Sequence, residues 1–268
     1  IQEIGGDLVF LSPDGIRTLA GTARIGDVEL TSVSRNIQRI IGEITRNINN
    51  LVITSVVLRS KSQYRLYYNN QSQASSLSKG IIGTFTGQGF EWSETTGIEA
   101  PALDSGFLYS GVEQVVHGDT DGYIYNHDTG ISFLHSGSAS NIDALYETPY
   151  LDFGDMGTRK TLQYAKISVS PDVDAGGFAQ PSLKVQFDFE DAIVQQPPVY
   201  VLPEIRGGAS FGTVFFNNAY FGSTDNPLIR QTIQGSCYTS NYTISSNDQL
   251  APYTINGLYI NYVPAGRR

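Results

Sequence analysis

The stretch from Gly111 to Gly130, GVEQVVHGDTDGYIYNHDTG, constrains the fold of this chain more than any other. Runs of β-branched and aromatic residues at Val112–Val116 and Tyr123–Tyr125 flank the pair Asp121-Gly122. Because glycine accepts the positive φ that tight turns require, this pattern predicts a β-hairpin. A strand, an Asp-Gly turn and a strand ending in a polar turn is typical of the inner part of a β-propeller blade. A plain antiparallel meander has the same pattern, so this stretch alone predicts only an all-β chain.

Other hairpin signals precede this stretch. Ser12-Pro13-Asp14-Gly15 lies between two strand-like runs, and proline ahead of Asp-Gly presets the turn. A second pair of predicted strands, Leu51–Leu58 and Gln63–Tyr68, turns at Lys61, and a third pair surrounds residues 87–89. The Asp-Gly turns at Asp14 and Asp121 enclose the Lys61 hairpin, and a spacing of about 50 residues fits repeated four-stranded blades.

One segment has helical rather than strand periodicity. In Ser34–Asn47, four isoleucines recur at i, i+3, i+4 and i+7, which predicts an amphipathic helix. Ser34 is a candidate N-cap. Gly42 and the β-branched residues weaken helix propensity, so we expect a short helix stabilised by packing.

The strand pattern changes beyond His135–Asn141, a small, polar, uncharged segment that we interpret as a linker. Ala165, Ile167 and Val169 alternate with polar residues, and so do Leu183, Val185, Phe187 and Phe189. One buried and one solvated face is typical of an antiparallel β-sandwich. We therefore expect an all-β fold: β-propeller blades, complete or partial, in residues 1–140, an antiparallel β-sandwich in residues 141–268, and one short helix.

The charge distribution is uneven. The net charge is −9, yet residues 80–158 contain no Lys or Arg and twelve acidic residues. These are Glu91, Glu94, Glu99, Asp104, Glu113, Asp119, Asp121, Asp128, Asp143, Glu147, Asp152 and Asp155. Such a stretch repels phosphate and argues against a conventional nucleic-acid reader. A solubilising surface is the alternative interpretation.

Candidate metal ligands are few. His117, His127 and His135 lie in or beside turns without the cysteine or helical histidine pairs of zinc sites. Asp119, Asp121 and Asp128 resemble the start of a calcium loop, but the twelfth position, which needs Glu, is Gly130. We expect Asp119 to bond the backbone of its own turn, and leave open whether Asp119 and Asp121 bind a cation.

No catalytic constellation is evident in the sequence. Carboxylates are abundant between residues 80 and 158, but no spacing singles out an acid–base pair. There is no Ser-His-Asp arrangement, phosphate-binding glycine loop or activated setting for the single cysteine, Cys237, which also cannot form an internal disulfide. The Asp-turn at residues 12–15 occurs once and lacks the aromatic residue of sialidase-type repeats. We expect no enzyme activity, no catalytic, cofactor-binding or metal-binding residues, and no cofactor.

Targeting signals are also lacking. No run approaches the roughly 18 apolar residues of a membrane span. Nothing at the acidic start of the chain indicates a signal peptide. The chain begins with Ile1 rather than Met, and we interpret it as a fragment or a processed product.

Several blocks, taken in order, carry a resemblance to a known family. They are GDLVFLSPDGIRTLAG, SRNIQRIIGEI, QYRLYYN, VVHGDTDGYIYNHDTG, YETPYLDFGDMGTRKTLQYAKISVS and LYINYVPAGRR. Together they resemble the tail nozzle (tail tubular) proteins of short-tailed bacteriophages, and equally the related propeller-type proteins that stabilise packaged DNA. The resemblance covers nearly the whole chain. Members of the family are usually longer, so residues 1–140 would be the later part of a propeller.

The resemblance implies a structural virion protein of the phage tail. In that family a β-propeller is joined to further β-domains, and six copies form the distal tube through which DNA leaves. The implied partners are five further copies of the chain in a hexameric ring, other tail proteins such as an adaptor and fibres, and double-stranded DNA in transient passage. A wall rich in acidic and amide side chains would guide DNA without holding it.

Two other functions remain as hypotheses. A carbohydrate-binding or host-receptor-binding module of a phage tail would use the aromatic, Asn-rich segments Gly207–Gly212 and Phe215–Gly222, which could equally be the edge of an aromatic core. A glycosidase is the third hypothesis.

Overall fold

A computed structural model describes residues 1–4, 6–19, 32–70, 79–129, 133–135, 137–171, 178–206, 228–249 and 253–267. The chain divides into two compact units. The N-terminal unit comprises Ile1–Gly130 and Leu134–Ser138, and the C-terminal unit comprises Ile131–Phe133 and Ala139–Arg268. The expectation of a mostly β chain is confirmed: strands form several antiparallel sheets, none of them closed in the described residues. The division at residues 140 and 141 into a propeller and a sandwich stays a prediction.

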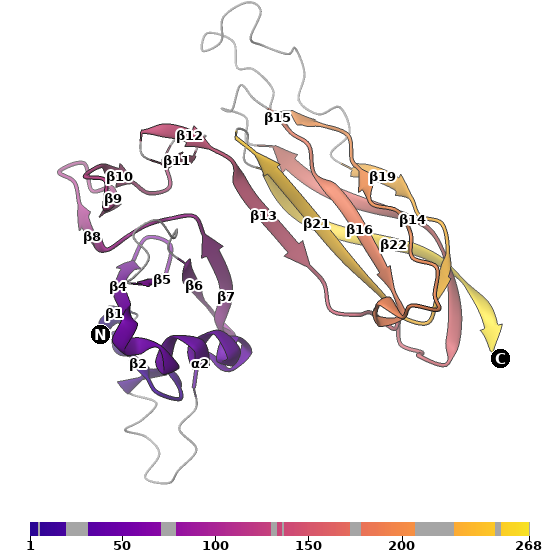
Figure 1. The fold of residues 1–268 in the computed structure, drawn as a ribbon, viewed down its shortest axis with the longest axis horizontal. Helices are drawn as coiled ribbons and strands as arrows, with labels where there is room; N and C mark the ends of the chain where they lie inside the picture. Colours follow the sequence, from indigo (N-terminus) through magenta and orange to yellow (C-terminus); the bar gives the residue numbers. More distant parts are fainter. Residues whose placement is uncertain are drawn as a thin grey trace, which may run out of the picture. The chain divides into compact units, whose positions relative to one another are not determined.

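Three meandering sheets form most of the N-terminal unit, and in each of them consecutive strands pair. The first contains β1 (Gln2–Ile4), β2 (Asp7–Ser12) and β3 (Gly15–Thr18); the second contains β4 (Leu51–Leu58), β5 (Gln63–Asn70), β6 (Lys79–Thr86) and β7 (Gly89–Thr96) (Figure 1). The third contains β8 (Ala102–Phe107), β9 (Glu113–Gly118) and β10 (Ile124–Asn126). The hairpins predicted at Asp14 and Asp121 are therefore confirmed.

The second sheet is buried on both faces. On one face, Tyr64, Leu66 and Ile81 pack with residues of the first sheet and of the helix. On the other face, Val56 and Leu58 pack with Val115 of β9. Strand β5 accordingly has four consecutive buried residues, Tyr64–Tyr67, where a strand with one wet face would alternate.

The predicted helix is confirmed with shorter bounds. A 3₁₀ turn, η1 (Arg35–Ile37), precedes α2 (Gln38–Arg46), and a second 3₁₀ turn, η2 (Ile48–Asn50), follows it. Ile41 and Ile44 are buried in the core, as the spacing predicts. The predicted side-chain cap is wrong. Ser34 makes no cap hydrogen bond, because its buried Oγ accepts the Ile16 N–H at 2.9 Å and so joins the start of the helical segment to β3.

Gly83 on β6 makes room for the single tryptophan. Gly83 lies directly opposite Trp92 of β7, and a Cβ built on it would lie 2.6 Å from the indole ring. The indole Nε1 donates to the Val33 carbonyl oxygen at 2.8 Å. The missing side chain thus lets Trp92 lie across β6 while its ring nitrogen anchors the segment before α2.

The C-terminal unit contains two larger antiparallel sheets. One orders its strands β13 (Ile142–Glu147), β21 (Ser240–Asp248), β16 (Ser182–Phe187) and β17 (Tyr200–Val201). In the other, β14 (Thr158–Pro171) pairs along one edge with β22 (Tyr253–Arg267) and along the opposite edge with β19 (Leu228–Thr232) and β20 (Ser236–Cys237). A short pair, β15 (Phe178–Ala179) and β18 (Ile205–Arg206), is separate, and the 3₁₀ turn η3 (Asp188–Glu190) follows β16.

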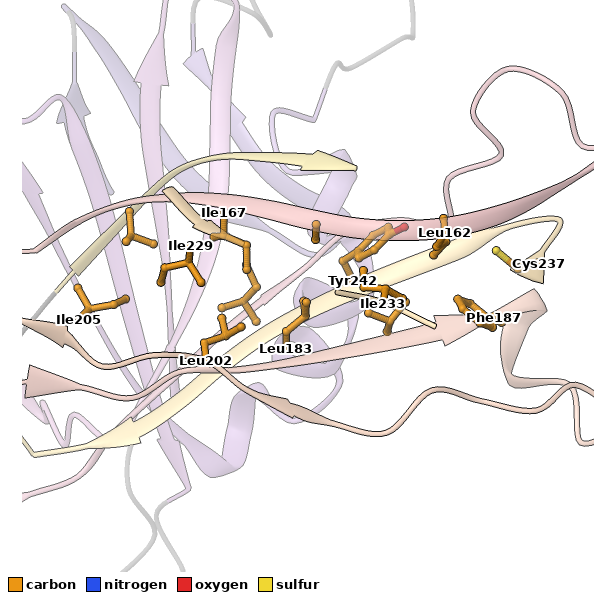
Figure 2. Close-up of a cluster of buried hydrophobic side chains, with 14 residues drawn as sticks. Leu162, Ile167, Leu183, Phe187, Leu202, Ile205, Ile229, Ile233, Cys237 and Tyr242 are labelled. Atoms are coloured by element: carbon orange, nitrogen blue, oxygen red, sulfur yellow. The ribbon is translucent and has the colours of Figure 1, made fainter. Parts of the chain in front are cut away.

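Both of these sheets contribute to one hydrophobic core. The predicted alternation is confirmed on β14, where Ala165, Ile167 and Val169 are buried, and on β16, where the same holds for three alternate residues from Leu183 to Phe187. Figure 2 shows Leu162 and Ile167 of β14 on the opposite side of this core from Leu183 and Phe187 of β16.

One sequence-based prediction is wrong here. Phe189 does not continue the buried face of β16: it lies in η3 with a φ of 59° and is 65% exposed. Asp188 explains the turn, because its carboxylate accepts the N–H groups of Tyr238 and Thr239 and so redirects the chain. The predicted linker His135–Asn141 contains the boundary between Ser138 of the N-terminal unit and Ala139 of the C-terminal unit, and it includes strand residues of the pair β11 (Phe133–His135) and β12 (Ser138–Ser140). The aromatic segments Gly207–Gly212 and Phe215–Gly222 lie outside the described residues.

Replacing Gly83 with alanine should destabilise the protein by about 1–3 kcal/mol, because the new methyl group overlaps the Trp92 ring in a packed core. Gly106→Ala on β8 is the matched control, since nothing lies within 4 Å of its Cβ position, and it should be neutral or slightly stabilising. Urea unfolding followed by tryptophan fluorescence measures both. Equal stability of the two variants would contradict the packing role of Gly83.

Candidate functional site

The Asp-Gly turn between β9 and β10 is held by the first of its two aspartates. Asp119 Oδ1 accepts the Tyr123 N–H at 2.8 Å, and the Asp119 N–H donates to the Tyr123 carbonyl oxygen at 3.1 Å. Gly122 has the positive φ, 87°, that the turn requires. The expectation that Asp119 bonds its own turn is therefore confirmed. Asp121 is exposed.

This turn brings two histidines together. His117 lies on β9 and His127 directly follows β10, where its N–H donates to the Val115 carbonyl oxygen at 2.8 Å. His117 Nδ1 and His127 Nε2 are 2.6 Å apart, so one ring donates a hydrogen bond to the other. Tyr125 stacks on His117, and Tyr67 of β5 meets His127 edge to face at 5.8 Å between ring centroids.

An arginine of the second sheet reaches the same place. Arg65 of β5 is 4% exposed, and its Nη2 donates to Asp128 Oδ2 at 2.6 Å and to Gln63 Oε1 at 2.7 Å. Lys61 Nζ donates to the same oxygen of Asp128 at 2.7 Å. We call Lys61, Gln63, Arg65, Tyr67, His117, His127 and Asp128 the inter-sheet polar cluster, since its side chains come from the second sheet and from the β9–β10 hairpin.

Burial and charge perturb the titration of the cluster. Burial lowers the pKa of His127 to about 4, and repulsion from His117 and Arg65 adds to this. Burial also lowers the pKa of His117, while the Asp119 carboxylate opposes the shift. For Asp128, burial opposes ionisation, but the hydrogen bonds from Arg65 and Lys61 outweigh it and lower the pKa to about 2. At neutral pH the cluster thus contains two neutral imidazoles beside a charged Arg–Asp–Lys group.

Two polar atoms of this region are buried without a hydrogen-bond partner among the described residues, the Tyr67 hydroxyl and Asp119 Oδ2. Burial raises the pKa of Tyr67. Within the described residues the Tyr67 hydroxyl makes no hydrogen bond to either histidine, so the contact between a nucleophile and its base is missing there. The contacts of Arg65 with Asp128 and of Tyr67 with His127 join the β9–β10 hairpin to the second sheet.

The other candidate residues are dispersed. In the part of the chain that the structure describes, no three His, Cys, Asp or Glu side chains lie close enough to hold a metal ion. The side chain of His135 lies outside that part. Cys237 is buried in the C-terminal core, and burial raises the pKa of its thiol to about 12. Among the described residues, no helix has the length and apolar character needed to cross a membrane.

Most acids of the base-free stretch face solvent. Eight of the twelve are exposed, and Glu113, Asp119 and Asp155 are partly buried. Glu99 is the exception: it is 6% exposed, and its Oε1 accepts the Thr120 hydroxyl at 2.7 Å. Glu99 is therefore part of the interior rather than of an acidic surface.

Sequence reasoning missed Arg65 and its acidic partner. Asp128 lies 63 residues from Arg65, and only the pairing of the strands brings the two together. One signal was present: an arginine inside the run Tyr64-Arg65-Leu66-Tyr67, which becomes a buried strand, requires an acid in contact with it.

Comparisons with known proteins add no identification. No protein-family model matches the chain, and no curated protein matches its sequence.

Replacing Asp128 with asparagine should lower the free energy of unfolding by about 2 kcal/mol, because it removes the charged acceptor of a buried guanidinium. Lys61→Gln removes the other cation, whose side chain is 49% exposed, and should cost less than about 1 kcal/mol. Chemical unfolding of both variants at pH 7 tests this. A Lys61 variant as unstable as the Asp128 variant would contradict the central role of Arg65.

The histidine pair should make stability fall in mild acid. Below pH 6.5, the ordinary pKa of histidine, His127 is protonated in the unfolded chain but stays neutral in the folded chain. Protons therefore favour the unfolded chain until the pH falls to about 4, where His127 is also protonated in the folded chain. His127 alone should contribute a loss of about 3 kcal/mol across that window. Urea unfolding at several pH values between 7 and 4 measures the loss, and His127→Gln should flatten the curve. The same pH dependence in both proteins would contradict this prediction.

Proposed function

We propose that this chain is a structural protein of a bacteriophage tail and forms part of the distal tube, or nozzle, through which DNA is retained and ejected. The order of sequence blocks that resemble tail nozzle proteins supports this function, and so does the way in which the sheets of the N-terminal unit pack.

The observation that carries the proposal is the contact between the first strands of successive sheets. Strand β1 contacts β4, and β4 contacts β8 and β9, while the second sheet is buried on both of its faces. Sheets stacked face to face, with their first strands together, are expected of consecutive propeller blades around an axis. We propose that the three sheets are blades of a partial propeller.

The C-terminal unit fits the second half of the proposed architecture. Its two larger sheets share one core, with inward-facing residues alternating along β14 and β16. This arrangement supports an antiparallel β-sandwich. A β-module with a shared core suits a protein that works by shape and contact, and we propose that it has no catalytic activity.

The proposed assembly is a homohexameric ring in the virion, docked to other tail proteins such as an adaptor and fibres. Exposed acids support transient passage of double-stranded DNA, because a wall that repels phosphate guides a duplex without adding salt-sensitive affinity. The acids proposed to face the passage include Glu91 and Glu94, which are exposed on β7, and exclude the buried Glu99.

In phage carrying this protein, Glu91→Lys with Glu94→Lys should retard DNA ejection while leaving the fold intact, since each new cation attracts phosphate. The delay should shrink as salt rises, because screening weakens the attraction. Single-particle ejection assays at several salt concentrations measure it, and Glu91→Gln with Glu94→Gln is the neutral control.

Ejection at the wild-type rate from the lysine variant would overturn the lining role of these acids. Images of the assembled particle test the ring itself: copies that do not surround the path of the DNA would overturn the nozzle function.

A carbohydrate-binding or host-receptor-binding module is the second candidate. It is favoured by a cluster of exposed apolar residues around the β8–β9 turn, where Phe107 is 59% exposed and Tyr109 is fully exposed. Exposed aromatic rings of this kind stack on sugars or dock on proteins. Binding on a glycan array that is lost in Tyr109→Ser would favour this module over the nozzle.

A further inference from the structure

The two larger sheets of the C-terminal unit have opposite charge. The strands β14, β19, β20 and β22, which we call the cationic sheet, carry five Lys or Arg residues and no Asp or Glu. The strands β13, β16, β17 and β21, the anionic sheet, carry three acids and one lysine. The linear sequence shows only part of this separation: residues 159–268 contain eight bases and eight acids, while two acids of the anionic sheet, Asp143 and Glu147, precede that range.

The outer face of the cationic sheet holds two like charges side by side. Lys166 of β14 lies directly opposite Arg230 of β19, and both alternate with residues that are buried in the core. Both cations lie over the ring of Tyr164, with the Arg230 guanidinium 4.3 Å from its centroid. Tyr259 of β22, opposite Lys166 on the other side, is 56% exposed.

The outer face of the anionic sheet has complementary features. Asp143, Leu145 and Glu147 of β13 lie opposite Asn247, Ser245 and Thr243 of β21, between residues of the inner face. Leu145 is 71% exposed and is flanked on both sides by the two carboxylates. The single lysine of this sheet, Lys184, is paired with Glu190, so it does not neutralise them.

In the part of the chain that the structure describes, the charged side chains of both faces lack partners of opposite charge, although Asn247 and Asn241 donate hydrogen bonds to Asp143 and Glu147. Within the described residues, neither Lys166 nor Arg230 forms an ion pair, and neither does Asp143 or Glu147. Like charges directly opposite each other on neighbouring strands destabilise a sheet. Because the two sheets pack on one core, their outer faces point away from each other, so the opposite charges cannot meet within one unit.

We infer that a second copy of this chain docks the Asp143–Leu145–Glu147 face of its anionic sheet on the Lys166–Arg230–Tyr259 face of the cationic sheet. Carboxylates would neutralise the two cations, and Leu145 would bury apolar area against the exposed tyrosine. The contact is heterologous, so its repetition joins copies head to tail. It names a contact surface for the ring and rests on the proposed function only for the closure of that ring.

A copy of the chain fits the cationic face better than a nucleic acid does. Two outward cations, Lys166 and Arg230, offer few of the phosphate contacts on which DNA affinity depends. The anionic face supplies carboxylates and an apolar centre together, and it is present on every copy at the same concentration as its partner.

The experiment compares reversed faces in the purified chain. Lys166→Glu with Arg230→Glu, and separately Asp143→Lys with Glu147→Lys, should each weaken self-association by at least about tenfold, because like charges then meet. An equimolar mixture of the two variants should associate again, since each retains one native face for the other. Sedimentation velocity over a range of concentrations, at about 50 mM and about 500 mM salt, measures association, which high salt should reduce.

A matched control makes the same change of charge, two cations replaced by glutamate, away from the proposed contact. Arg35→Glu with Arg39→Glu, exposed on the helical segment of the N-terminal unit, should associate as the wild type does. Circular dichroism confirms folding, and Lys166→Gln with Arg230→Gln replaces the glutamate variant if the latter does not fold.

Three results would overturn the inference: a wild-type chain that stays monomeric at low salt, face variants that associate as tightly as the wild type, or a mixture that fails to recover. Retention of DNA by the wild-type cationic face, lost in the Lys166–Arg230 variant while self-association persists, would also overturn it in favour of phosphate binding. Images of the assembled particle test the proposed ring independently of these association experiments. An error in the contact surface can therefore be distinguished from an error in the proposed function.

Discussion

The attachment of the third sheet to the second in the N-terminal unit depends on the ion pair between Arg65 and Asp128. A guanidinium that is 4% exposed must have an anionic partner, because an unpaired buried charge costs several kcal/mol. Asp128 supplies the partner from the far end of the β9–β10 hairpin, and the neighbouring histidine rings are kept neutral by the same burial. The pair therefore fixes which part of the third sheet lies on β5. Hydrophobic contacts between these sheets, by comparison, involve few buried residues.

The sequence predicted what depends on neighbours along the chain. The Asp121-Gly122 turn, the isoleucine spacing of α2 and the alternation on β14 are local patterns, and all three are confirmed. Sequence-based prediction failed where a residue distant in the sequence determines the local structure. Ser34 is a good helix cap in isolation, but the Ile16 N–H needs its oxygen. Phe189 continues an apolar alternation, but the Asp188 carboxylate, bound to two backbone N–H groups of residues 238 and 239, turns the chain first. The inter-sheet polar cluster could not be predicted for the same reason, because residues distant in the sequence form it.

The distribution of charge was likewise only partly predictable from the sequence. The stretch without Lys or Arg, residues 80–158, can be recognised from the sequence alone. Most of its acids are exposed, as expected from the energetic cost of packing like charges together. Glu99 could not be separated from its neighbours by sequence, since only its contact with Thr120 places it in the interior. Residues 139–268 of the C-terminal unit hold twelve acids and eight bases. Their division into a cationic and an anionic sheet arises only because β14 pairs with β19 and β22 rather than with β13.

In the nozzle that we propose, these two electrostatic features would suit opposite tasks. A surface past which DNA slides must avoid phosphate contacts, and an excess of exposed acids does so at any position along the duplex. Subunits that assemble around that duplex must instead recognise one another at a fixed place, which requires cations and carboxylates in register rather than in excess. Placing scarce cations on one sheet, stacked on Tyr164 and remote from the acids of the other sheet, leaves them available for such a contact. If both proposals hold, the chain would repel the DNA that passes it and attract its own copies, because different strands carry the two kinds of surface.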